Sequence, residues 1–166
     1  NAQLNDRNFA EAIKECLIEA PIDGKCYSSP HGIMPFWDTT DLTDMSGAFK
    51  GRTTFNANIS LWNVSNVKNM SEMFYSASSF DHDIRVWNVK NLLQVDDMFS
   101  KADRMKEVFN VHEKTPMNWL NSLAEKNTSV FSADCMKICD LDYWEKSALK
   151  DLGSIVSDKF GKQVIG

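Results

Sequence analysis

The chain has 166 residues, of which 43% are hydrophobic, and it carries a formal net charge of −5 with a pI near 5.2. This length and composition fit one domain that buries a continuous apolar core. The basic residues are scattered among acidic ones, which argues against nucleic acid as a partner, because phosphate binding requires clustered Lys and Arg.

Residues 1–36 are predicted to form an N-terminal capping helix and a loop. The chain starts without an initiator Met or the apolar core of a signal peptide, so we expect a processed or trimmed product. No apolar run approaches the roughly 20 residues that span a bilayer, so we expect a soluble chain. Pro21 and Gly24 end the predicted helix. Between Asp6 and Ala20, one helical face carries Phe9, Ile13, Cys16, Leu17 and Ala20.

Four cysteines flank the central region as two local pairs, Cys16 with Cys26 and Cys135 with Cys139. This arrangement suits two disulfides that close the two ends, although three connectivities remain open. A Cys16–Cys26 bridge would tie the end of a helix to the following loop. A Cys135–Cys139 bridge would require an irregular turn, because side chains four apart on a regular helix point in nearly parallel directions. Buried free thiols are the alternative.

Residues 37–111 contain three 25-residue repeats, which align on Trp37, Trp62 and Trp87. Apolar residues recur in further columns of the same alignment. We predict that the repeats stack, because one unit alone has an apolar side that it cannot bury. The predicted repeat core consists of Trp37, Met45, Phe49, Phe55, Ile59, Trp62, Val67, Met70, Met73, Phe74, Phe80, Ile84, Trp87, Leu92, Met98 and Phe99.

Each repeat combines two local patterns. Polar and apolar residues alternate from Asp83 to Val89, as in a strand, whereas Met70, Met73, Phe74 and Ala77 follow helical spacing. These patterns predict an α/β repeat, specifically a short solenoid with helical N- and C-terminal caps. The Asn and Ser residues between the apolar columns are interpreted mainly as structural, because their side chains satisfy turn backbones.

Residues 112–166 are predicted to form a helical C-terminal region. Thr115 and Pro116 indicate a helix start, a second helix begins near Ser132, and a third runs from about Leu141 to Phe160. This is more helix than a plain cap requires, so two interpretations stay open: a helical cap that buries its own apolar stripe, and a docking surface for a partner. The candidate interface residues are Trp119, Tyr143, Trp144 and Phe160, because aromatic residues often anchor protein interfaces.

The sequence predicts no catalytic residue, no metal site and no cofactor. His31, His82 and His112 have no partner at the spacing of metal ligands, and the aspartates around Asp38 and Asp81 lack an EF-hand pattern. No phosphate-binding loop or nucleophile elbow is present in the sequence. The pair Cys135 and Cys139 is the one enzyme-like feature, and it suggests a thiol-disulfide redox protein as a minor alternative.

The middle repeat carries Trp62, Asn63, Val64, Ser65, Val67, Met70, Met73, Phe74, Ala77, Phe80, Asp81, Asp83 and Ile84. This pattern resembles the BspA-like leucine-rich repeat family, also described as the mycoplasma-type lipoprotein 25-residue repeat. The first and third repeats match less fully, and an opening such as Phe9 to Ile13 followed by Cys16 and Cys26 looks like that of algal members. The resemblance implies that the predicted solenoid is right-handed and leucine-rich-repeat-like. It also implies protein interaction at a surface or in a lumen, without catalytic residues.

We therefore predict a non-catalytic protein-interaction or scaffolding module that binds protein partners, neither binds nucleic acid nor spans a membrane, and can belong to a larger assembly. The cysteine pairs favour an oxidising compartment, either extracellular or at the cell surface, or in an organelle lumen such as that of the thylakoid. The alternative is a structural or linker subunit of a large algal complex, for example a photosynthetic one. The exposed strand face near Arg85 and Asn88 is a second place for a partner.

Overall fold

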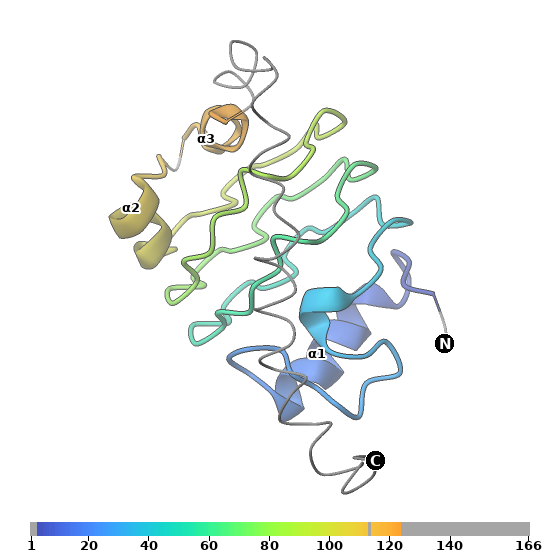
Figure 1. The fold of residues 1–166 in the computed structure, drawn as a ribbon. Coiled ribbons are helices and arrows are strands. Elements are labelled where there is room, and N and C mark those ends of the chain that lie inside the picture. The colour runs from blue at the N-terminus through green and yellow to red at the C-terminus, as the bar shows by residue number, and fades with distance from the viewer. Residues whose placement is uncertain (1–2, 113, 124–166) are drawn as a thin grey trace, which may run out of the picture. The chain divides into compact units, whose positions relative to one another are not determined.

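The computed structural model describes residues 3–112 and 114–123, which belong to one unit of the chain, Asn1–Glu125. Figure 1 shows helix α1 (Phe9–Glu19) at one end of the turn-rich segments, and α2 (Asp103–Phe109) and α3 (Pro116–Asn121) at the other. A short 3-10 helix, η1, spans Met34–Phe36. No helix in the described part of the chain is both long and apolar enough to cross a bilayer.

The predicted fold class, an α/β right-handed leucine-rich-repeat-like solenoid with helical caps, is wrong. Between residues 3 and 123, leaving out 113, the chain consists mostly of turns and loops with few helices and contains no strand. Residues 83–89 form no strand, and residues 70–77 form turns in place of a helix. Only two isolated parallel bridges occur in this part, Asp44 with Asn69 and Asn69 with Gln94.

The predicted helix of each repeat is absent because left-handed residues interrupt its backbone twice. A helix and a strand both need consecutive residues with negative φ, so a residue with φ near +60° ends either structure. These residues lie four apart within a segment and 25 apart between segments. They are Gly47, Gly51, Glu72, Ser76, Asp97 and Lys101.

We call residues 44–51, 69–76 and 94–101 the turn rows. In the first row, the amides of Met45, Gly47, Phe49 and Gly51 donate to carbonyls of the second row, at N to O distances of 2.7 to 2.9 Å. Of the amides between them, those of Ala48 and Lys50 donate to the carbonyl three residues back, and that of Ser46 donates to Oδ1 of Asp44. Every second amide therefore joins neighbouring rows edge to edge, although neither row forms a strand.

Aromatic side chains at equivalent positions stack between neighbouring segments. The ring centroids of Phe49 and Phe74 lie 5.7 Å apart, and those of Phe74 and Phe99 lie 5.6 Å apart. Phe9 of α1 packs on Trp62. All residues named as the repeat core are buried, namely Trp37, Met45, Phe49, Phe55, Ile59, Trp62, Val67, Met70, Met73, Phe74, Phe80, Ile84, Trp87, Leu92, Met98 and Phe99.

The helices at the two ends differ in how well the sequence predicts them. α1 lies inside the predicted range and buries most of the predicted face, including Phe9 and Leu17. α3 begins at Pro116 after the N-cap Thr115, as predicted. The sequence does not predict α2, because its residues continue the columns of the third repeat. The helices expected near Ser132 and over 141–160 lie outside the described residues, and the domain boundaries remain predictions.

A disulfide joins Cys16 of α1 to Cys26 in the following loop, with the two Cα atoms 5.0 Å apart. Both cysteines are buried. Gly24, between them, has φ +65°, and a Cβ there would lie 2.8 Å from Cβ of Met34. Only glycine fits this close approach without a shift of the backbone. Cys135 and Cys139 lie outside the described residues.

Candidate interaction surface

Three large apolar side chains are exposed at equivalent positions of successive segments. Phe36, Leu61 and Val86 are 70%, 55% and 65% exposed, and each directly precedes one of the aligned tryptophans. We call these three residues the apolar row. Single exposed apolar residues are ordinary, but an aligned series on adjoining segments marks a candidate contact surface.

The tryptophans next to the apolar row anchor its backbone. Trp37, Trp62 and Trp87 are buried. The indole Nε1 of Trp37 donates to the carbonyl of Gly32 at 2.8 Å, and that of Trp62 donates to Met34 at 2.9 Å. Trp87 donates in the same way to a residue of the preceding segment. Each residue of the row is therefore held in place by the buried residue that follows it.

Side-chain oxygens on both sides of the row fix the turns. Asp38, Asn63 and Asn88 follow the row residues by two positions, and Asn58 and Asp83 precede Leu61 and Val86 by three. In each case the side-chain Oδ1 accepts the backbone N–H two residues later, at 3.0 to 3.4 Å. Such turns restrict the backbone by local hydrogen bonds. The apolar row is thus presented by a constrained backbone.

At the end of the row, Arg85 covers two aromatic rings. Its guanidinium lies over Phe109 and Trp119, and its Nη2 pairs with Oδ2 of Asp83 at 2.6 Å. The hydrogen bonds from Arg85 hold the pKa of the Asp83 carboxyl below its usual value. Trp119, named as a candidate interface residue, is 9% exposed and packs on Phe99. It is covered inside the described unit.

The other candidate interface residues, Tyr143, Trp144 and Phe160, lie outside the described residues. Of that predicted set, the structure describes only Trp119, which is buried. Arg85 and Asn88, the second predicted place for a partner, flank Val86 of the apolar row. The face that they mark is built from turns and contains no strand.

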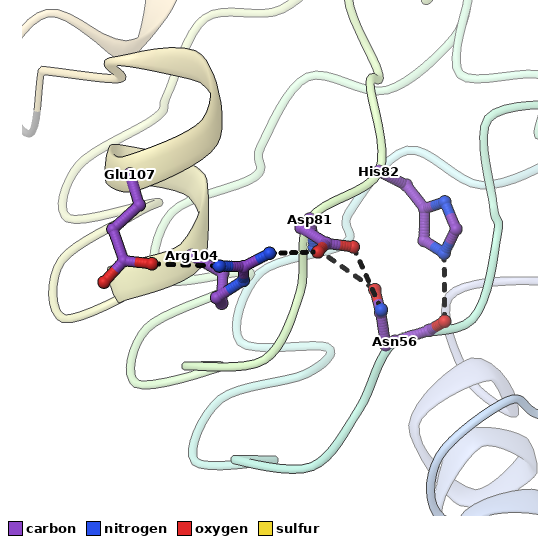
Figure 2. Close-up of polar contacts among 5 residues, drawn as sticks. All are labelled: Asn56, Asp81, His82, Arg104 and Glu107. Carbon is purple, nitrogen blue, oxygen red and sulfur yellow. Dashed lines mark hydrogen bonds and ion pairs between the residues drawn. The ribbon is translucent and has the colours of Figure 1, made fainter.

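A second polar cluster, shown in Figure 2, links the tips of two segments to α2. Asn56 and Asp81 lie 25 residues apart and exchange two hydrogen bonds, at 3.0 and 3.2 Å. Arg104 of α2 bridges Asp81 Oδ2 at 3.1 Å and Glu107 Oε2 at 3.0 Å. The hydrogen bond from Asn56, with help from Arg104, lowers the pKa of Asp81. This carboxylate stays ionised near neutral pH and serves to position α2.

The histidines occupy separate places. His82 Nε2 lies 3.0 Å from the carbonyl oxygen of Asn56, and the ring of His31 packs edge-on against Trp37. Nδ1 of His112 accepts the backbone N–H of Lys114 at 3.3 Å. Among the residues that the structure describes, no three His, Cys, Asp or Glu side chains are grouped to hold a metal ion.

Comparison with known families gives one match, which covers most of the chain. A family described as "Mycoplasma protein of unknown function, DUF285" matches residues 26–144. The chain belongs to this family. No curated protein and no solved structure matches the chain. The DUF285 match begins at the cysteine of the disulfide loop and includes all three repeats, so it covers both the apolar row and the polar cluster.

The sequence carries a signal for the apolar row that periodicity alone does not reveal. The residue before each aligned tryptophan is large and apolar in all three repeats. These residues form a column like those of the core, and periodicity does not tell a buried column from an exposed one. The exposure arises because the tryptophan side chain turns inward, and the preceding side chain then points to solvent.

Proposed function

We propose that this DUF285 protein is a non-catalytic protein-interaction module that binds a protein partner along the apolar row. One observation carries the proposal: Phe36, Leu61 and Val86 remain exposed in 25-residue register on a constrained backbone. Exposing three large apolar side chains in line costs free energy, which association with an apolar surface offsets. The partner is therefore expected to present apolar side chains of its own.

The constrained backbone of the row supports this proposal. Binding is weakened when flexible groups must be ordered, and a surface fixed in advance avoids much of that cost. The buried tryptophans and the flanking side-chain turns supply this order before a partner arrives. Polar groups beside the row, such as Asn63 and Asn88, are exposed. They would form a polar rim around an apolar centre, as protein interfaces commonly do.

Two finer assignments form part of the proposal. The middle repeat supports a BspA-like repeat of algal type within the DUF285 family, on the residues from Trp62 to Ile84. The disulfide between Cys16 and Cys26 supports an oxidising compartment, because disulfides persist where thiols are not kept reduced. Mass spectrometry of non-reduced peptides from freshly isolated protein tests the latter, and free thiols at both positions would contradict it.

The test of partner binding compares two exposed leucines. Leu61 belongs to the apolar row, whereas Leu93 is 76% exposed and lies elsewhere in its repeat, one residue after Leu92 of the core. Peptides selected from a random display library against the wild-type chain should lose binding to Leu61→Asp and keep it with Leu93→Asp. Equal binding to both variants, or loss in both, would show that the apolar row is not the contact surface.

A further inference from the structure

The two outer edges of the turn rows are chemically different. Met70, Glu72 and Phe74 of the second row donate their amides to carbonyls of the third row, 24 residues later, at 2.8 to 2.9 Å. The first row donates to the second with the same offset. Hydrogen bonds between rows therefore always run in one direction, which leaves carbonyls at the first edge and amides at the last.

At its outer edge, the third row has accessible hydrogen-bond donors. By the same alternation, the backbone amides of Val95, Asp97 and Phe99 are the ones that would donate to a further row. Within the described residues, the amides of Val95 and Asp97 make no hydrogen bond, and both residues line an open pocket of about 430 Å³. Phe99 is buried and its ring packs on Trp119, so the accessible donors belong to Val95 and Asp97.

At the opposite edge, the first row has accessible hydrogen-bond acceptors. The carbonyls of Asp44 and Ser46 are the equivalents of those that accept hydrogen bonds in the second and third rows. Neither accepts a hydrogen bond from any described residue, and both residues are exposed. They line a pocket of about 450 Å³, which α1 borders through Ala10 and Lys14. A row of unpaired backbone groups is a ready template for pairing with another chain.

The charges around the two edges are complementary. The pocket at the donor edge is lined by Asp96 and Asp97 together with Lys114. The pocket at the acceptor edge carries Lys14, Lys50 and Arg52, together with Asp6 and Asp44. Lys14 pairs with Glu11 and Lys50 with Glu72, whereas Arg52 makes no ion pair with a described residue. The carboxylates of Asp96 and Asp97 in one molecule are therefore suited to Arg52 of another.

We propose that a second copy of this chain occupies each edge, so that molecules associate head to tail. The amides of Val95 and Asp97 in one copy would donate to the carbonyls of Asp44 and Ser46 in the next, which continues the offset seen between the rows of one molecule. Such a contact joins two different surfaces and generates open chains or rings rather than a symmetric dimer. The apolar row takes no part in it.

The proposed contact between two copies is weak, because each edge is only partly accessible. α1 borders the acceptor pocket and the residues Lys114 and Pro116 border the donor pocket, so only the exposed part of each edge is available. Association should therefore depend on protein concentration and weaken with added salt, because it relies on few hydrogen bonds and on exposed charges.

Two charge-reversal variants of the full chain test the proposal. Asp96→Lys places a positive charge at the donor edge opposite Arg52, and Arg52→Glu places a negative charge at the acceptor edge opposite Asp96 and Asp97. Both residues are exposed and their side chains make no hydrogen bond or ion pair with described residues, so folding should be preserved. Sedimentation analysis of the wild type should show a mass that rises above 18.9 kDa with concentration. Each variant alone should associate at least about fivefold more weakly, because like charges then face each other.

An equimolar mixture of the two variants is the decisive sample. The positively charged donor edge of Asp96→Lys then meets the negatively charged acceptor edge of Arg52→Glu. The opposite pairing joins two edges that keep their wild-type charges. The mass should therefore recover to that of the wild type. A wild type that stays monomeric, or a mixture that does not recover, would overturn the proposal. Monomeric protein with the Val95 and Asp97 amides protected from exchange would also overturn it, because the edge is then covered within one molecule. Leu61→Asp should leave association unchanged, which separates this result from the proposed partner binding.

Discussion

Turn rows 44–51 and 69–76 follow the same backbone path with different residues. The first row places Gly47 and Gly51 at its two left-handed positions, and the second places Glu72 and Ser76 there. Glycine adopts this conformation freely, whereas other residues adopt it at a cost of about 1 to 2 kcal/mol each. The comparison teaches that the hydrogen bonds between rows impose the conformation and that glycine only makes it easier.

The largest expected effect comes from removing the stacking that both rows share. Phe74 is fully buried between Phe49 and Phe99, and Phe74→Asp would place an unpaired carboxylate there. We expect a loss of about 5 kcal/mol or more, which should abolish cooperative unfolding. Thermal denaturation followed by circular dichroism measures it, with Leu93→Asp as the exposed control. A melt like that of the wild type would show that the rows are not stacked.

The next effect separates backbone conformation from packing. No heavy atom lies within 4 Å of a Cβ built on Gly51, whose φ is +73°, so a side chain there meets only conformational strain. Gly51→Val should lower the free energy of unfolding by about 2 kcal/mol, because a β-branched residue is poorly tolerated at positive φ. Chemical denaturation checks this value. Gly51→Ser, the residue found at position 76, is the milder control, and an equal loss in both variants would argue for steric contact instead.

A third change makes the tip of the second segment like that of the first. Asp81→Asn introduces the residue type of Asn56 and removes the charge that faces Arg104. The folded-state pKa of Asp81 lies below its ordinary 3.8, so its contribution is present above that pH and is lost as the pH falls through the folded-state value. We expect a loss of about 1 kcal/mol at pH 7.

The pH dependence provides the check on this prediction. Chemical denaturation of wild type and Asp81→Asn should differ at pH 7, and the difference should shrink below about pH 4, as Asp81 becomes protonated first in the unfolded and then in the folded wild type. A difference that stays constant down to about pH 2 would mean that the carboxylate charge is not the source of the stabilisation.

The smallest expected effect is a gain. Ser76→Gly gives the second row the residue of the first, and it relieves a left-handed serine with φ +57°. The relief is partly offset by the greater freedom of glycine in the unfolded chain, so we expect a net stabilisation of about 0.5 kcal/mol. Differential scanning calorimetry of Ser76→Gly against Ser76→Ala measures it. Destabilisation by glycine relative to alanine would show that position 76 does not need a left-handed backbone in solution.

The same two rows show which parts of the fold are predictable. Columns such as Phe49, Phe74 and Phe99 identify buried positions, because large apolar residues at a constant spacing of 25 fall in line when the repeats stack. The backbone is not predictable in this way, since Glu72 and Ser76 carry no sign of a left-handed conformation. The spacing from Met70 to Ala77 imitates that of a helix, because the turns also place every third or fourth side chain inward.

The candidate site is harder to predict than the core. Phe36, Leu61 and Val86 share the periodicity of buried residues, and only the inward turn of each following tryptophan reveals them as exposed. The predicted anchor Trp119 is of an amino-acid type that is common in interfaces, but Arg85 and Phe99 cover it. The amino-acid type of Trp119 therefore predicts an exposed contact residue, whereas its packing makes it part of the core.

The indole hydrogen bonds of the tryptophans have an optical consequence. Nε1 of Trp62 and of Trp87 donates to a carbonyl 28 residues earlier, so each indole reports on the junction between two segments. Separation of those segments would expose the ring to water and shift its fluorescence emission to longer wavelength. Replacing the tryptophans one at a time by phenylalanine would assign each part of the emission change. The protein thus carries its own set of spectroscopic probes, spaced along the chain, with which the order of opening can be followed without an added label.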